Sequence, residues 1–118
     1  MDHYILEGKT PVKVDHLTWA RWFETADRTV KRDYIGEIMV STVFMGLDHR
    51  FNRNGPPILF ETMIFGGVFD GYQTRYSNWV EAEKGHGAAL NLVDPPTVLD
   101  AEFIEFEEEN LSIENPKQ

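Results

Sequence analysis

The chain has 118 residues, a formal net charge of −9, 42% hydrophobic residues and 26% charged residues. Its length predicts one domain, and its composition argues against a collagen-like chain, a coiled coil or a wholly disordered protein. The sequence contains no cysteine, which excludes a disulfide scaffold, a thiolate zinc finger, an iron–sulfur site and a cysteine nucleophile.

The first third of the chain predicts a β-hairpin followed by a helix. Short apolar runs at residues 4–6 and 12–14 flank a turn-forming segment that contains Gly8 and Pro11. The alternative for this region is a single strand and a turn. Asp15 is a suitable N-cap for a helix over about residues 16–27, where apolar side chains recur at three- and four-residue spacings.

The middle of the chain predicts two long strands joined by a loop. Residues 38–45 and 58–65 are rich in β-branched and aromatic residues, and residues 46–57 contain the turn signal Asn54-Gly55. We expect the two strands to pair antiparallel, with the loop between them projecting outward. A two-residue period puts one set of side chains on a common face of the first strand: Ile38, Val40, Thr42 and Phe44.

The last third predicts a short strand near residues 72–76 and then a helix that begins after Asn78. Two glycines, Gly85 and Gly87, lie within this helical pattern and would each cost roughly 1 kcal/mol relative to alanine. A helix that continued to Val93 would align an apolar seam, but we expect a break or distortion at Gly85–Gly87. The fold class expected from these elements is α+β: a mainly antiparallel sheet of three to five strands with two helices packed on one face.

Negative charge is concentrated at the C-terminal end. Residues 94–118 contain eight acidic residues and one Lys, a net −7, whereas residues 1–93 contain twelve acidic and ten basic residues, a net −2. We therefore predict a single globular domain over residues 1–93 and an acidic tail over residues 94–118 that is partly ordered at most. Lys and Arg supply most of the affinity for phosphate, so this charge disfavours nucleic-acid binding through a broad basic face.

The sequence predicts a cytoplasmic protein with no membrane partner. Its longest apolar stretch, residues 38–47, is interrupted by polar residues and falls short of the roughly 20 residues of a membrane-spanning helix. The first residues lack the basic and apolar regions of a secretory signal.

Four residues could form a metal or acid–base site if the fold brought them together. They are Asp48, His49, Glu61 and His86. Carboxylate and imidazole groups ligate metals and transfer protons, but no metal-binding or phosphate-binding motif is present. The structural alternative is that Asp48 ties a turn, Glu61 pairs with an arginine, and His86 packs in the core or caps an element. We expect no cofactor and no nucleophilic serine, since neither Ser41 nor Ser77 lies in a nucleophile-elbow motif.

A second group of residues is typical of an interaction surface. Arg50 and Arg53 flank Phe51 in the central loop, and Arg75 precedes Tyr76. Aromatic and arginine side chains anchor many protein interfaces, and they can also stack on a base or hold a phosphate. The alternative is that these arginines only solvate the loop ends. The candidate binding residues are Asp48, His49, Arg50, Phe51, Arg53, Arg75 and His86.

Three stretches carry a family resemblance. Residues 40–51 read VSTVFMGLDHRF, residues 55–67 read GPPILFETMIFGG, and residues 75–86 read RYSNWVEAEKGH. With the early segment Trp19–Trp22, they resemble a small protein family common in bacteriophage and prophage genomes. The resemblance covers roughly residues 4–90 and carries over no catalytic residue. It implies a phage origin and expression inside a bacterial host.

These observations favour a non-enzymatic phage accessory protein over an enzyme. Such a protein would bind a host or phage macromolecule, most simply a protein, and could inhibit a host enzyme or defence system. One alternative is a small-ligand- or metal-binding enzyme that uses the Asp48, His49, Glu61 and His86 cluster. Another is a minor virion or assembly component, and homo-oligomerisation also stays open.

Overall fold

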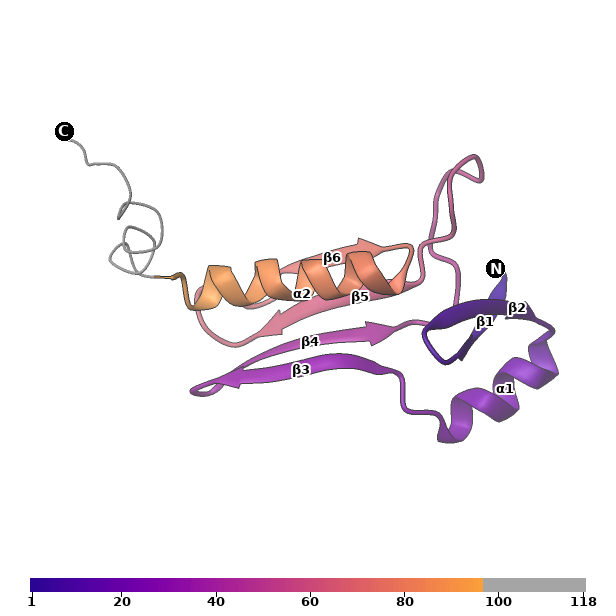
Figure 1. The fold of residues 1–118 in the computed structure, drawn as a ribbon, viewed down its shortest axis with the longest axis horizontal. Helices are drawn as coiled ribbons and strands as arrows, with labels where there is room; N and C mark the ends of the chain where they lie inside the picture. Colours follow the sequence, from indigo (N-terminus) through magenta and orange to yellow (C-terminus); the bar gives the residue numbers. More distant parts are fainter. Residues whose placement is uncertain (97–118) are drawn as a thin grey trace, which may run out of the picture.

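A computed structural model of the chain describes residues 1–96. The predicted acidic tail lies outside the described residues from position 97 onward. The elements follow in this order (Figure 1): β1 (His3–Glu7), β2 (Thr10–Val14), α1 (His16–Thr25), β3 (Thr29–Ile35), β4 (Ile38–Phe44), β5 (Phe60–Phe65), β6 (Gln73–Tyr76) and α2 (Trp79–Val93).

The strands form two antiparallel sheets. β1 and β2 make the predicted N-terminal hairpin, and the other four strands make a meander in the order β3-β4-β5-β6. β4 and β5 are the central pair, with Thr42 opposite Thr62 and Phe44 opposite Phe60. The prediction that these two segments are antiparallel neighbours is therefore confirmed, as is the α+β fold class.

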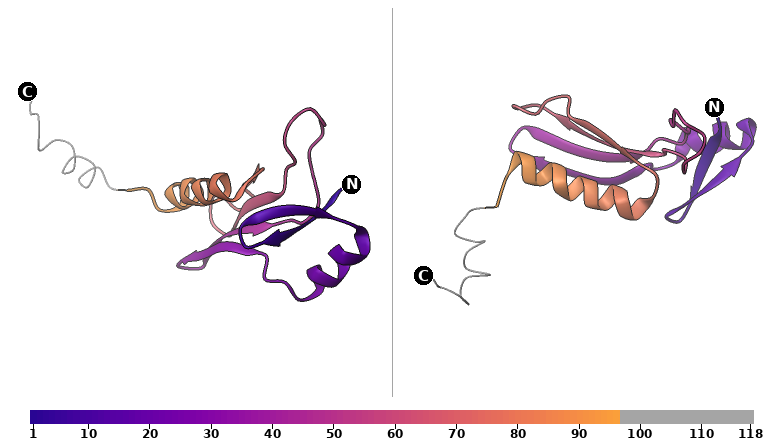
Figure 2. Two further views of the ribbon diagram at one scale, coloured as in Figure 1. Left: turned by 45° about the vertical axis from the view of Figure 1, so that its right-hand side comes forward. Right: turned by 90° about the horizontal axis from the view of Figure 1, so that it is seen from above.

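α2 covers one face of the four-stranded sheet and contacts all four strands (Figure 2). The side chains beneath it alternate along each strand as predicted: Val40, Thr42 and Phe44 of β4 are fully buried. α1 lies elsewhere, since its main contact is with β1. The prediction that both helices pack on one face is therefore right for α2 only, because α1 packs against the N-terminal hairpin.

The predicted break at Gly85–Gly87 is wrong, because α2 is continuous from Trp79 to Val93. The Asn78 side chain accepts a hydrogen bond from the Glu81 N–H group, as expected for a capped first turn. The physical reason for glycine in the second turn is the side chain of Tyr76. A Cβ atom at Gly85 would overlap the Tyr76 ring, so the glycine lets this ring pack against the helix.

Two apolar clusters fill the space between α2 and the sheet. The first contains Phe44, Leu59, Phe60 and Ala82, and the second contains Val40, Ile64 and Ala89. Trp22 of α1 reaches the first cluster, with its ring centroid 5.8 Å from that of Phe44. No helix in residues 1–96 is long and apolar enough to cross a membrane.

Candidate functional site

The loop between β4 and β5 projects from the end of the larger sheet (Figure 1). We call residues 46–58 the Phe51 loop. Residues 51–56 are all exposed, whereas Asp48 near its start is buried. The loop is thus an outward-facing segment with an internal anchor, in agreement with the prediction that the bend lies outside the core.

Asp48 is the anchor of the Phe51 loop. It is only 3% exposed, and its carboxylate accepts hydrogen bonds from the N–H groups of Arg50 (3.0 Å) and Ile58 (3.1 Å). Its second oxygen lies 2.7 Å from Arg50 Nε. Because Arg50 follows Asp48 closely and Ile58 ends the loop, one carboxylate ties both ends of the loop together.

The environment of Asp48 favours its ionised form. Burial alone would raise the pKa of this carboxyl group, but the hydrogen bonds from Arg50 and Ile58 and the positive charges of Arg50 and Arg53 outweigh burial and lower the pKa. Of the two roles that the sequence allowed for Asp48, the structure supports the structural one, in which its carboxylate ties the turn.

Arg53 connects the Phe51 loop to the N-terminus of the chain. Its Nη2 atom lies 2.7 Å from Asp2 Oδ2, and its Nη1 atom lies 3.3 Å from Asp48 Oδ2. The N–H group of Asp48 also donates to the carbonyl of Asp2 at 3.1 Å. The hydrogen bond from Arg53 is the main reason that the pKa of Asp2 is lowered. Substituting Arg53 would therefore disturb the loop itself as well as its surface.

Phe51 has no cover from the described part of the chain. Its side chain is completely exposed, while its neighbours in the loop are held by Asp48. Exposing a whole phenylalanine side chain forfeits about 1.5–3 kcal/mol of burial free energy. Such a side chain on an anchored loop is typical of a residue that is buried by a partner.

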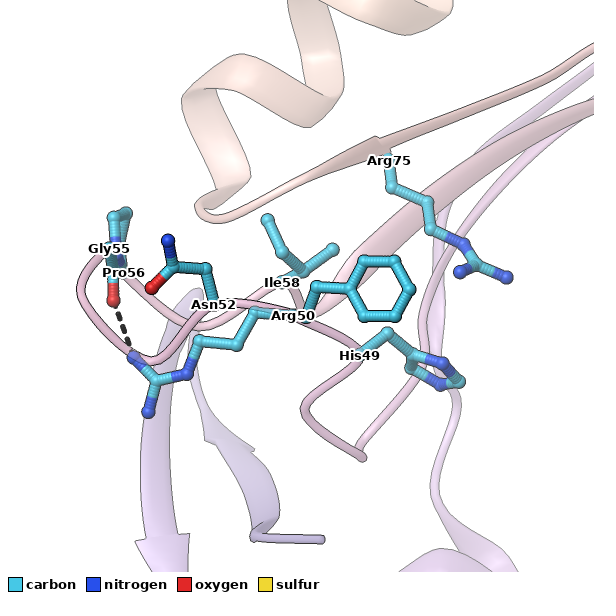
Figure 3. Close-up of a pocket in the computed structure, with 8 residues that line it drawn as sticks. His49, Arg50, Asn52, Gly55, Pro56, Ile58 and Arg75 are labelled. Carbon is cyan, nitrogen blue, oxygen red and sulfur yellow. Dashed lines mark hydrogen bonds between the residues drawn. The ribbon is translucent and has the colours of Figure 1, made fainter.

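A hollow of about 490 Å³ opens beside Phe51. Its walls are formed by the loop and by β6: His49, Arg50, Phe51, Asn52, Gly55, Pro56, Ile58 and Arg75. Figure 3 shows His49 and Arg75 directed to the same side of the hollow, whereas Arg50 turns back and donates to the Gly55 carbonyl. Apolar and cationic groups thus lie next to each other at this end of the molecule.

Arg75 is held by Glu61 on the neighbouring strand. The two residues face each other across β5 and β6, and Arg75 Nε lies 3.0 Å from Glu61 Oε2. Gln73 also donates a hydrogen bond to this carboxylate. Glu61 therefore pairs with an arginine, as predicted in the alternative to a metal site, and this ion pair fixes the direction of Arg75 beside the hollow.

His86 lies beneath α2 in a buried chain of polar groups. It is 1% exposed, and its Nδ1 atom lies 2.7 Å from Thr42 Oγ1, which in turn lies 2.5 Å from Thr62 Oγ1. On its other side, Nε2 lies 2.8 Å from Asp33 Oδ2. Sequence analysis missed Asp33, Thr42 and Thr62 as partners of His86. Thr42 and Thr62 each lie at an inward-facing position of a central strand, and a polar residue at such a position needs a buried hydrogen-bond partner.

The hydrogen-bonded arrangement of Asp33, His86 and Thr42 resembles a catalytic triad, but the Thr42 hydroxyl group is not accessible as a nucleophile. Thr42 is fully buried under α2 and its hydroxyl group is engaged by both His86 and Thr62. A nucleophile needs a neighbouring space in which a reacting atom can sit. This chain of hydrogen bonds instead satisfies polar groups inside the core.

The hypothetical cluster of Asp48, His49, Glu61 and His86 does not form. Asp48 is engaged by arginines, Glu61 by Arg75 and Gln73, and His86 by core residues. Within residues 1–96, no group of three or more His, Asp or Glu side chains is placed to hold a metal ion. Of the predicted binding residues, the structure brings His49, Arg50, Phe51 and Arg75 to one hollow and puts His86 in the core.

The chain was compared with family models, curated proteins and solved structures, and none of them matches it.

Proposed function

We propose that this chain is a small, non-catalytic accessory protein of a bacteriophage or prophage, and that it captures a protein of the host or the phage through the Phe51 loop. The phage origin rests on the sequence resemblance of the three motifs. Inhibition of a host enzyme or defence system is one form that such capture would take.

The single observation that carries the binding role is the complete exposure of Phe51 on a loop that is otherwise pinned. Binding is stronger when the binding residue is already held in place, because less conformational entropy is lost on association. The Asp48 carboxylate and the Asp2–Arg53 ion pair provide this preorganisation. Arg75 and His49 add polar contacts at the edge of the same hollow.

The arrangement supports binding better than catalysis. Asp48, Glu61 and His86 are each engaged by other residues in separate places, and Thr42 beside His86 is fully buried. By contrast, the hollow beside Phe51 combines an aromatic side chain with arginine, as interface hot spots do.

The test is quantitative capture from a lysate of infected bacteria, followed by binding measurements with the purified protein that is enriched. We expect Phe51→Ala to weaken binding by about ten- to a hundredfold, as is usual for loss of a central aromatic anchor. Thermal stability should remain within about 0.5 kcal/mol of the wild type, because the side chain is exposed in the free protein.

The matched control is Val68→Ala. Val68 is another exposed apolar residue, 94% accessible, but it lies in the turn between β5 and β6 rather than in the Phe51 loop. If Val68→Ala reduces capture as much as Phe51→Ala does, or if neither reduces it, the Phe51 loop is not the binding surface. A loss of melting temperature in Phe51→Ala would instead assign the side chain a structural role.

A further inference from the structure

The second face of the four-stranded sheet has no covering element in residues 1–96. α2 occupies one face, and α1 and the N-terminal hairpin lie at the end of the sheet (Figure 2). The side chains that alternate with the buried set therefore point to the uncovered side. We call this surface the open face, and its side chains include Arg32, Met39, Glu61, Met63, Phe65 and Arg75.

Part of the open face is a continuous apolar patch. Tyr34 lies opposite Met39, and Met39 lies opposite Phe65. Met63 is two residues from Phe65 on the same strand and therefore points to the same side. Tyr34 is 65% exposed and Phe65 is 42% exposed. Contiguous exposed apolar side chains on a small protein usually mark an interaction surface.

The charges of the open face distinguish between two ways of packing it against a second copy. With a two-fold axis parallel to the strands, β4 faces the partner's β5 and β3 faces the partner's β6. Met39 then meets Phe65, and Arg32 meets Gln73, with no like charges opposed. An axis across the strands would instead put Arg32 opposite its own copy and Glu61 opposite Phe65. The face is therefore self-complementary about the first axis.

The size of the open face fits a weak dimer. Four strands at a spacing of about 4.8 Å and six residues at about 3.4 Å each give a flat footprint of roughly 400 Å² per copy. The two copies together would bury roughly 800 Å², which is below the about 1,200 Å² of stable interfaces and in the range of weak, transient association. Two sheets can pack face to face about 10 Å apart, as in a β-sandwich.

We propose that two copies of this chain associate through their open faces, with β4 of one copy over β5 of the other, to form a symmetric sandwich of two four-stranded sheets. The interface buries Met39, Met63 and Phe65 at its centre. Arg32 and Arg75 lie toward its edges, where each meets an uncharged side chain of the second copy.

Sedimentation equilibrium of the full-length chain at micromolar to millimolar concentration tests this proposal. We expect a monomer–dimer equilibrium in the wild type and at least a tenfold rise in the dissociation constant for Met63→Lys, because two lysines would be buried near the axis. Leu92→Lys is the matched control, since it adds the same charge at an exposed apolar residue of α2, away from the open face. This variant should dimerise within about twofold of the wild type, a difference of less than 0.5 kcal/mol.

Cross-linking tests the alignment. The chain has no cysteine, so Arg32→Cys and Gln73→Cys each provide a unique attachment point for a short bis-maleimide. We expect an equal mixture of the two variants to cross-link several times more than either variant alone.

Three results would overturn the proposal. They are a wild-type monomer at millimolar concentration, a dimer that Met63→Lys does not weaken relative to Leu92→Lys, and cross-linking of the single variants that equals that of the mixture. The monomeric Met63→Lys variant also separates this proposal from the Phe51 function, because it retains the loop and should still bind the captured partner one to one.

Discussion

Gly85 and Gly87 lie two residues apart in the same helix, and we expect alanine to have opposite effects at these positions. In the interior of a helix, replacing glycine with alanine normally stabilises by about 0.5–1 kcal/mol. At Gly87 a Cβ atom would meet nothing within 4 Å, so Gly87→Ala should show this gain. At Gly85 a Cβ atom would overlap the ring and hydroxyl group of Tyr76.

The cost at Gly85 follows from the position of Tyr76. This side chain packs against the cluster of Phe44, Leu59, Phe60 and Ala82, and its hydroxyl oxygen is buried. The ring can move only by disturbing that cluster, and overpacking of this kind costs about 1–3 kcal/mol or more. After the helical gain is subtracted, Gly85→Ala should be less stable than the wild type by up to about 2.5 kcal/mol, and its melting temperature should fall by up to about 20 °C.

The assay is urea and thermal unfolding of both variants, each measured also in a Tyr76→Ala background. Removing the ring should abolish the penalty, so that Gly85→Ala becomes neutral or stabilising there while the effect of Gly87→Ala is unchanged. Equal stability of the two single variants, or a Gly85 penalty that survives the loss of Tyr76, would refute the account of why α2 carries glycine at this position.

Three further predictions concern the buried polar groups. Asp48→Asn should lower the free energy of unfolding by about 2–4 kcal/mol at pH 7, because it removes the charge that holds Arg50 and Arg53. The pKa of Asp48 is lowered in the folded state, so its contribution is complete above the pKa of an unfolded carboxyl group, about 4, and is lost as the pH falls through the lower folded value. Urea unfolding from pH 7 to pH 2 should therefore show a smaller acid-induced loss in Asp48→Asn than in the wild type, and parallel curves would contradict this role. Thr42→Val should lower the free energy of unfolding by about 1–3 kcal/mol and by more than Thr62→Val, because Thr42 is hydrogen-bonded to both His86 and Thr62, whereas Thr62 is hydrogen-bonded to Thr42. Equal losses of stability in thermal melts would contradict this order of hydrogen bonds.

The main features of the sheet could be predicted because β-strand patterns are local. Alternation along residues 38–44 correctly grouped on one face the side chains that α2 covers, and Asn54-Gly55 located the turn between the central strands. Asp15 and Asn78 cap their helices as predicted, since a cap depends on residues only three positions apart.

The rest depends on contacts between residues that are distant in the sequence. Glycine lowers helix propensity wherever it occurs, so the pattern predicted a break in α2. The helix is continuous, and only the placement of Tyr76 explains why it carries glycine at position 85. In the same way, the sequence singled out Asp48 and His86 as candidate site residues, but their partners Asp2 and Asp33 lie 46 and 53 positions away along the chain. A sequence pattern shows that such groups need partners and does not show which ones they find.

The proposed dimer changes what the Phe51 loop can do. A two-fold axis parallel to the strands keeps the same ends of the two sheets together, so both Phe51 loops would project from one end of the dimer. A target with two copies of the binding site could then be held by both loops, and the second contact would form at a high effective concentration. The alternative axis would put the loops at opposite ends and remove this gain. Comparing a surface-immobilised partner with the same partner free in solution therefore separates the two geometries: only the first predicts tighter capture on the surface, and Met63→Lys should abolish the difference.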